Sequence, residues 1–260
     1  NQVNLEFEAS VAGGIPIIRT IKEGLATNKI TKIYGILNGT CNYILSEMEI
    51  SKDNLQNVLK KAQKLGYAEP GNAKLDLDGS DALSKVKILS SLGYNMKISR
   101  SKCLKEGIQN IEAEDIDISN KLNFRIKLLG ISQIINNKIL ERVHPCLIKK
   151  DTYIANVQGV MNAVILNGSP IGESVLQGEG AGPKPTSSAL MSDLLSILRG
   201  NIKFPFGIAY NKRKTIKNYN YNNYFNAFYL RLEVNDKPGV LSYITKNLAK
   251  NKISIERVIQ

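Results

Sequence analysis

Four carboxylates lie close to Lys85 in the stretch "GYAEPGNAKLDLDGSDALSKVKILSSLGY", residues 66 to 94. The carboxylates are Glu69, Asp76, Asp78 and Asp81. Carboxylates beside an ammonium can hold a charged substrate and pass a proton to or from it. Acidic groups just before a helix often only complement its dipole, however, and exposed ion pairs need no functional explanation. These residue types therefore leave both a binding site and a structural ion pair open.

The second half of the stretch, residues 80 to 92, has the apolar spacing of a helix. On a wheel of about 100° per residue, Leu89 and Leu92 fall on either side of Lys85, and Asp81 lies one turn before it. The opposite side carries Ser84, Lys87 and Ser91. The wheel therefore places this pair on the inward side. A buried ammonium is costly unless it is paired, and a lysine paired in this way could exchange a proton. A structural lysine that extends past the apolar side chains to water remains the alternative.

Composition limits the remaining possibilities. The chain has 260 residues, of which 43% are hydrophobic, enough for one large domain or for one domain and a smaller one. It has no secretory signal and no apolar run of about 18 residues, so we expect no membrane span. The three cysteines form no C-x-x-C pair, and there is a single histidine, His144. A metal or disulfide framework is therefore not expected, and a cytoplasmic location fits.

The net charge of +12 comes from lysines and arginines that are spread along the whole chain. The exception is "NKRKTIKNYNYNNY", residues 211 to 224, which combines basic residues with tyrosines. Such a mixture could bind single-stranded nucleic acid. We favour a solvated linker, because charge without apolar periodicity is typical of loops. No nucleic-acid partner is therefore expected.

Turn and cap signals divide the rest of the chain into strands and helices. Residues 1 to 9 are expected to form a strand, "VAGGIPII" a turn into a helix, and residues 32 to 37 a short strand. Thr40 could cap a helix that runs to Met48, and "DNLQNVLKKAQKLG" predicts an amphipathic helix that stops at Gly66. "FRIKLLGISQII" and "KILERVHPCLI" predict a hairpin around Asn136-Asn137.

The later segments predict a mixed arrangement. "ANVQGVMNAVIL" indicates a pair of strands, and "GEGAGPKPTSSALMSDLLSIL" a glycine-rich loop before a helix capped near Thr186 or Ser187. After residue 225 the pattern is strand, turn, helix and strand. Because strands and helices do not alternate regularly, we expect an α+β fold with a mixed sheet covered by helices.

Several separate blocks resemble the catalytic domain of the homoserine dehydrogenase family. They are "EASVAGGIPII", "GILNGTCNYIL", "LGYAE" with the following "DGSDALSK", "IKLLGI", "VHPCLI", "VQGVMNAV" and "GEGAGPKPTSSALMSDL". Their order across residues 5 to 200 is that of the family. The tail, with "NDKPGVL", is similar to the first half of an ACT domain, an amino-acid-binding module with a ferredoxin-like βαβ fold. The resemblance divides the chain into a catalytic domain (1–208), a linker (209–225) and a partial ACT domain (226–260).

The resemblance also implies roles for single residues. Lys85 would donate and accept the proton on the substrate's oxygen, Asp81 would bind substrate and orient Lys85, and Glu69 would hold the substrate's amino group. Thr40, Tyr67 and Asp76 would line the pocket, although a segment one residue longer than usual leaves Asp78 as an alternative to Asp76. The cofactor would touch Gly66 and the glycines Gly180 or Gly182. A monovalent cation, usually Na⁺, would bind Glu8 and the carbonyl groups of Val11, Gly13 and Ile15.

The implied reaction is the NAD(P)-dependent interconversion of L-homoserine and L-aspartate 4-semialdehyde, in threonine, methionine and isoleucine biosynthesis. No G-x-G-x-x-G motif is present to choose between NAD and NADP. From the family's domain order we expect a dinucleotide-binding domain before this chain, and little turnover by the chain alone. A homodimer and an L-threonine effector at the ACT domain are further expectations. The alternative is a non-catalytic, ACT-type regulatory protein that senses amino acids.

Overall fold

The computed structural model describes residues 3–71, 73–201 and 204–259, and it divides into two compact units, Asn1–Tyr224 and Phe225–Gln260. The strands of the first unit are β1 (Lys29–Ile36), β2 (Leu104–Lys105), β3 (Phe124–Ile135), β4 (Lys138–Lys149), β5 (Met161–Ser169) and β6 (Gly172–Glu179). Its helices are α1 (Ile17–Arg19), α2 (Gly39–Ser51), α3 (Leu55–Lys64), α4 (Ala73–Leu77), α5 (Ser80–Gly93), α6 (Ala113–Lys121) and α7 (Pro183–Leu198). Within the described ranges, no helix has the length and apolar character needed to cross a bilayer.

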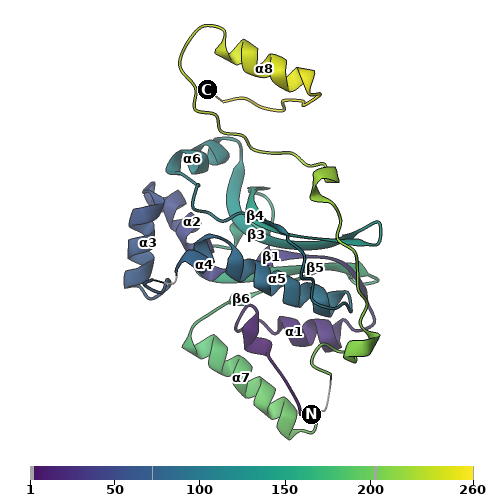
Figure 1. The fold of residues 1–260 in the computed structure, drawn as a ribbon. Coiled ribbons are helices and arrows are strands. Elements are labelled where there is room, and N and C mark those ends of the chain that lie inside the picture. The colour runs from purple at the N-terminus through teal and green to yellow at the C-terminus, as the bar shows by residue number, and fades with distance from the viewer. Residues whose placement is uncertain (1–2, 72, 202–203, 260) are drawn as a thin grey trace. The chain divides into compact units, whose positions relative to one another are not determined.

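The six strands of the first unit form one mixed sheet, in the order β2-β4-β3-β1-β5-β6 (Figure 1). β2 pairs with β4 in parallel, and the other neighbours are antiparallel. The predicted hairpin is confirmed as β3 and β4. Its two turn residues, Asn136 and Asn137, have φ angles of 48° and 59°, which a two-residue type I′ turn requires. The α+β class predicted from the sequence is therefore correct.

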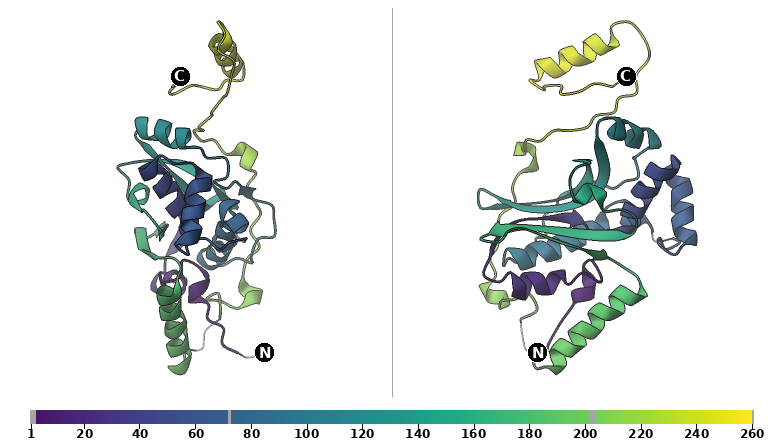
Figure 2. Two further views of the ribbon diagram at one scale, coloured as in Figure 1. Left: turned by 90° about the vertical axis from the view of Figure 1, so that its left-hand side faces the viewer. Right: turned by 180° about the vertical axis from the view of Figure 1, so that it is seen from behind.

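The two faces of the sheet bury different sets of side chains. Along β3, Ile126 and Leu128 belong to the main core, beneath α1 and α5, which lie against one face of the sheet (Figures 1 and 2). Leu129 and Ile131 alternate with them and belong to a smaller cluster on the other face. This alternation follows from the period of two in a strand. The start of α5 lies near the end of β1, where Lys85 bonds to the Leu37 carbonyl oxygen.

Some of the predicted elements were wrong. Residues 3 to 7 form no strand, and a short 3₁₀ turn (Glu8–Ser10) follows them, whereas residues 1 and 2 lie outside the described residues. Glu8 explains the difference, because its carboxylate accepts the N–H groups of Ile18 and Arg19 at the start of α1. Of the strand pair expected around "ANVQGVMNAVIL", only β5 forms. The edge strand β6, with few apolar residues, was not predicted.

The segment before β5 is held by side chains that no periodicity reveals. A 3₁₀ turn (Ile154–Asn156) starts it, and the Asn42 amide of α2 donates to the carbonyl groups of Val157, Gly159 and Met161 at 2.9–3.1 Å. These bonds replace the strand pairing that the sequence pattern suggests.

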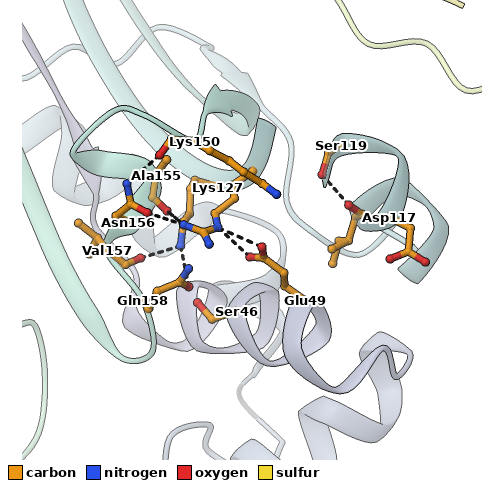
Figure 3. A network of polar contacts seen from close by, with 12 residues as sticks. Ser46, Glu49, Asp117, Ser119, Lys127, Lys150, Ala155, Asn156, Val157 and Gln158 are labelled. Atoms are coloured by element: carbon orange, nitrogen blue, oxygen red, sulfur yellow. Dashed lines mark hydrogen bonds and ion pairs between the residues drawn. The ribbon is translucent and has the colours of Figure 1, made fainter. Parts of the chain in front are cut away.

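Lys127 of β3 completes this arrangement from the sheet (Figure 3). Its side chain is buried, with 1% of the residue exposed, and Nζ lies 2.9 Å from Asn42 Oδ1 and 2.6 Å from the Val157 carbonyl oxygen. Gln158 Oε1 is a third acceptor, at 3.4 Å. Burial lowers the pKa of Lys127 from 10.5 to about 8. The lysine therefore ties β3 to α2 and to the segment before β5 at an electrostatic cost.

Residues 210 to 224 are hydrogen-bonded to the rest of the first unit at several points, although the sequence predicts a solvated linker there. Lys214 exchanges backbone hydrogen bonds with Asn95 and Lys97, at 3.0 and 2.9 Å, and Ile139 pairs in the same way with Lys217 and Tyr219. At the end of the segment, the Tyr224 ring lies 4.4 Å from the guanidinium of the buried Arg142. The division between the units therefore falls after Tyr224 rather than at residue 208.

In the part that the structure describes, the second unit contains one helix, α8 (Val240–Lys250). The two strands predicted on either side of it are not formed in its described residues, 225–259. Two strands and a helix bury little apolar surface alone, and sheets of fewer than three strands are marginal. The apolar side chains of these segments accordingly remain exposed, among them Phe228, Leu230 and Leu232.

Candidate active site

Asp81 and Lys85 form the predicted ion pair on the first two turns of α5. Lys85 Nζ lies 2.7 Å from Asp81 Oδ2, and the side chains are 20% and 31% exposed respectively. A second bond, of 3.0 Å, joins Lys85 Nζ to the carbonyl oxygen of Leu37 at the end of β1. The pair is therefore half-buried against the sheet. Ser91, predicted on the solvent side, is instead buried, because its hydroxyl donates to the Met96 carbonyl group.

Asn38 joins this pair to a second carboxylate, Asp76 of α4. Asn38 Nδ2 lies 2.8 Å from Asp76 Oδ1 and 2.9 Å from Asp81 Oδ2. Its Oδ1 accepts the N–H of Cys41 at 2.8 Å, which makes Asn38, rather than the predicted Thr40, the N-cap of α2. The N-cap preference for Asn was visible in the sequence, but the bridge between two carboxylates was not.

Thr40 and Tyr67 link α2 to the loop after α3. The Thr40 hydroxyl donates to the Tyr67 carbonyl oxygen at 2.6 Å. The ring of Tyr67 lies 4.9 Å from that of Tyr43 between centroids. Gly66 has a φ of 77°, which favours glycine, and it turns the chain at the end of α3 as predicted. This turn carries Tyr67 and the exposed Glu69 toward the start of α5.

These elements surround a cavity of about 610 Å³. It is lined by Thr40, Gly66, Tyr67, Glu69, Leu75, Asp76, Ser80, Asp81, Ser84, Ala181 and Gly182. Seven of the residues named from the sequence are thus brought together, from segments more than 100 residues apart. Lys85 does not line the cavity itself but bonds to Asp81, which does. Leu75, Ser80, Ser84 and Ala181 were not predicted, and their residue types carry no signal of their own.

The structure distinguishes Asp76 from Asp78. Asp76 lines the cavity, and burial raises its pKa, an effect that the hydrogen bond from Asn38 partly offsets. Asp78 accepts from Lys105 Nζ at 2.7 Å and from the Ser80 N–H at 2.8 Å. Although desolvation acts against it, these bonds lower the pKa of Asp78 to about 2. Asp78 is therefore tied to the start of α5, and Asp76 is the carboxylate available to a ligand.

The glycines predicted to touch a cofactor differ in their surroundings. A Cβ atom at Gly66 would meet nothing within 4 Å, and at Gly182 only the ring of Pro185, at 3.8 Å. Both backbones are open to close approach by a flat ring. Gly180 is not, because a Cβ atom there would lie 2.1 Å from the Asn162 side chain. Gly180 is thus needed for packing, and it sets the path of the wall formed by Ala181 and Gly182.

Gly180→Ala is expected to lower the free energy of unfolding by about 1–3 kcal/mol, because backbone or Asn162 must move to admit the methyl group. Urea unfolding measures this. Gly24→Ala is the control, since a Cβ atom there meets nothing within 4 Å, and it should stay within about 0.5 kcal/mol of the parent. Equal midpoints for the two variants would show that the glycine is not required by packing.

The predicted cation ligands lie in a tight turn beside α7. Ala12 and Gly13 have φ angles of 55° and 40°, and the Ile15 carbonyl group accepts from Ile17 at 2.7 Å. Glu8 is buried, and its own N–H donates to Asp193. Burial raises the pKa of Glu8, and the N–H groups of Ile18 and Arg19 oppose that shift. The carboxylate thus already has two donors at the start of α1.

Comparison with known proteins identifies the family of the chain. The family model described as homoserine dehydrogenase matches residues 16–195. Homoserine dehydrogenase of Neisseria gonorrhoeae is 42% identical over 266 residues, and that of Helicobacter pylori is 42% identical over 254 residues. These matches cover 99% and 98% of this chain but 60% of each relative. The chain therefore spans about 60% of the length of these relatives.

Solved structures give the same result. A homoserine dehydrogenase from Thiobacillus denitrificans superimposes with a TM-score of 0.80 at 39% identity, over 98% of this chain and 60% of that one. A hyperthermophilic archaeal homoserine dehydrogenase mutant, solved in complex with NADPH, matches 75% of this chain and 55% of that one, with a TM-score of 0.61 at 29% identity. The chain belongs to the homoserine dehydrogenase family.

Proposed function

We propose that the protein carrying this chain interconverts L-homoserine and L-aspartate 4-semialdehyde with NAD(P). One observation carries the proposal: Glu69, Asp76 and Asp81 line a single cavity, with Lys85 bonded to Asp81. Carboxylates suit the ammonium of an amino acid, and the lysine suits an oxygen that gains or loses a proton. Membership of the family supports the same substrate.

Lys85 would manage the proton. Its ammonium has three N–H donors, of which Asp81 Oδ2 and the Leu37 carbonyl oxygen take two. We assign the third to the substrate's oxygen, which requires the Lys85 side chain to extend past Asp81, because Lys85 does not itself line the cavity. In the reduction of the semialdehyde, Nζ gives this proton to the oxygen as it becomes a hydroxyl, and in the oxidation the neutral amine takes it back. Asp81 keeps Nζ in place throughout.

Asp76 and Glu69 would hold the other end of the substrate. Both line the cavity, and Asp76 lies next to Asp81 across the Asn38 amide. Fixing the ammonium there orients the chain of the amino acid and converts the encounter of its C4 with the cofactor into a near-unimolecular step. Tyr67 and Thr40 complete this wall.

NAD(P), when bound, supplies or accepts the hydride. The open backbones of Gly66 and Gly182 fit the approach of a nicotinamide, whereas Gly180 is closed by Asn162. Comparing the rates of NAD⁺ and NADP⁺ reduction decides which of the two cofactors is used. The archaeal relative solved with NADPH supports a nicotinamide cofactor in the family.

We also propose a monovalent cation at the turn of Val11, Gly13 and Ile15, held by their carbonyl oxygens. Backbone oxygens suit hard cations. Glu8 would add charge rather than a free ligand, because its oxygens already accept from Ile18 and Arg19. Raising NaCl in place of choline chloride should raise the melting temperature if the cation binds. Equal melting temperatures in the two salts would remove it from the proposal.

A homodimer and regulation by L-threonine are further parts of the proposal. Partly buried apolar residues on the outer face of the sheet, such as Ile148 and Met161, support association through that face. Sedimentation of the complete protein tests the first. Inhibition by L-threonine, and its loss when residues 225–260 are removed, tests the second.

The activity is tested by the L-homoserine-dependent reduction of NAD⁺ and NADP⁺ in the complete protein. Absorbance at the reduced nicotinamide band should rise with L-homoserine and stay flat with L-serine, whose hydroxyl lies one carbon closer to the ammonium. If neither cofactor is reduced with L-homoserine, the proposed activity is wrong, whatever the fold.

A further inference from the structure

We propose that Asn38 is a positioning residue, which holds the carboxylates of Asp76 and Asp81 side by side for the substrate. This inference rests on the proposed function for its kinetic consequences. Asn38 is 5% exposed and touches α2, α4 and α5 at once. None of the motifs considered in the sequence assigns it this role.

The orientation of the Asn38 amide is fixed by its surroundings. Oδ1 accepts the Cys41 N–H, so Nδ2 must face the two carboxylates. A flipped amide would place Oδ1 against two anionic oxygens and NH₂ against an N–H donor, and both contacts would be repulsive. Each proton of the NH₂ group therefore serves one carboxylate. Helix capping and carboxylate positioning are performed by opposite ends of the same amide.

The Asn38 amide stabilises the two neighbouring carboxylates beside the cavity by donating a hydrogen bond to each. Lys85 bonds to Asp81, whereas Asn38 is the one side chain among the described residues that donates to the Asp76 carboxylate. Burial and, to a lesser degree, the charge on Asp81 raise the pKa of Asp76, and the Asn38 hydrogen bond lowers it. Without the amide, Asp76 would keep a proton to higher pH and could turn away from Asp81. Binding of a substrate ammonium would then weaken.

The two functions of Asn38 can be separated by substitution. Asn, Asp and Ser are comparable N-caps, so Asn38→Ser and Asn38→Asp keep the acceptor for the Cys41 N–H. Both lose the NH₂ donor, and Asn38→Asp adds a third negative oxygen beside Asp76 and Asp81. Asn54 provides a matched control, because it caps α3 through the Asn57 N–H at 3.0 Å, and Asn54→Ser affects no cavity residue.

In the complete protein, we expect Asn38→Ser to raise KM for L-homoserine at least tenfold, with a smaller change in kcat, and Asn38→Asp to raise it further. The acidic limb of the pH profile of kcat/KM should move to higher pH in Asn38→Ser. Asn54→Ser should keep the parent's KM and profile. The two serine variants should melt close to the parent, whereas Asn38→Asp should melt lower, because its carboxylate lies beside those of Asp76 and Asp81. Parent-like KM and pH profiles in both Asn38 variants would overturn the inference.

A readout without turnover separates this inference from the proposed function. Carboxyl ¹³C NMR follows the titration of Asp76 in the parent, in Asn38→Ser and in Asn54→Ser. The midpoint for Asp76 should rise only in Asn38→Ser. If it rises while the parent fails to oxidise L-homoserine, the activity is wrong and the positioning by Asn38 stands. If it does not move, the positioning is wrong, whatever the activity.

Discussion

Lys85→Met is expected to lower kcat for L-homoserine oxidation by about a thousandfold, the middle of the range for loss of a general acid–base group. Methionine matches the length of the lysine stem but has no proton to exchange. KM should change far less, since the ammonium of the substrate is assigned to the carboxylates and not to Lys85. Initial rates with saturating NAD⁺ or NADP⁺ in the complete protein measure both constants.

The control for this change is Lys87→Met, on the same helix. Lys87 Nζ is directed to the Ser101 carbonyl oxygen and away from the cavity, so its loss should leave kcat within about twofold of the parent. Circular dichroism should show the same helix content in both variants. If Lys85→Met retains kcat within tenfold of the parent, the proton is exchanged by another group, and Lys85 serves only to pair with Asp81.

The parts of the fold that depend on local pattern were predictable. The β3–β4 hairpin has two long apolar runs and Asn136-Asn137 between them, and these signals act within about 25 residues. The helix α5 likewise follows from its apolar spacing and the acidic residues before it. In both cases the signal that identifies the element lies in neighbours in sequence, so periodicity and turn chemistry were sufficient to predict it.

The parts that depend on distant partners were not predictable. Residues 210 to 224 are largely polar and basic, and bonds to distant residues such as Asn95, Lys97 and Ile139 order them against the rest of the first unit. Glu8 ends the expected first strand because Ile18 and Arg19 are near it in space. The residues that line the cavity were found mostly through the resemblance, whereas Asn38 depends on Asp76, 38 residues later.

Lys127 shows the same limit most strongly. A lysine within the apolar run "FRIKLLGI" has no sequence signal that distinguishes a buried ammonium from an edge of the sheet. The structure places it in the interior, where the Val157 carbonyl group and Gln158 Oε1 accept from Nζ (Figure 3). Asn42 Oδ1 is a further acceptor, and no carboxylate is in direct contact among the described residues. The nearby Glu49 is paired with Arg125 instead.

The burial of Lys127 makes the free energy of unfolding change with pH in the alkaline range. Because burial lowers the pKa of Lys127 from 10.5 to about 8, the unfolded chain binds more protons than the folded one between those values. The free energy of unfolding therefore rises with pH across that window, whereas below it Lys127 adds a constant cost that does not change with pH. About 2.5 pH units at about 1.4 kcal/mol each gives a total contribution of about 3–4 kcal/mol.

Lys127→Met should abolish this rise. Urea unfolding of the parent and the variant at pH 7.5, 8.5, 9.5 and 10.5 gives the difference in the free energy of unfolding at each pH. Taking the difference cancels buried tyrosines and cysteines, such as Tyr94 and Cys146, whose raised pKa values make stability fall in alkali. The parent should gain on the variant by about 3 kcal/mol from pH 7.5 to 10.5.

Lys138→Met, at the exposed start of β4, is the matched control and should show no such trend. A flat difference for Lys127→Met would mean that its ammonium is stabilised as well in the fold as in water. That result would contradict the cost assigned to its burial, because three neutral acceptors would then replace hydration completely. A rising difference would show that the ammonium of Lys127, which bonds to α2 and to the segment before β5, lowers the free energy of unfolding. This cost disappears when Lys127 loses its proton.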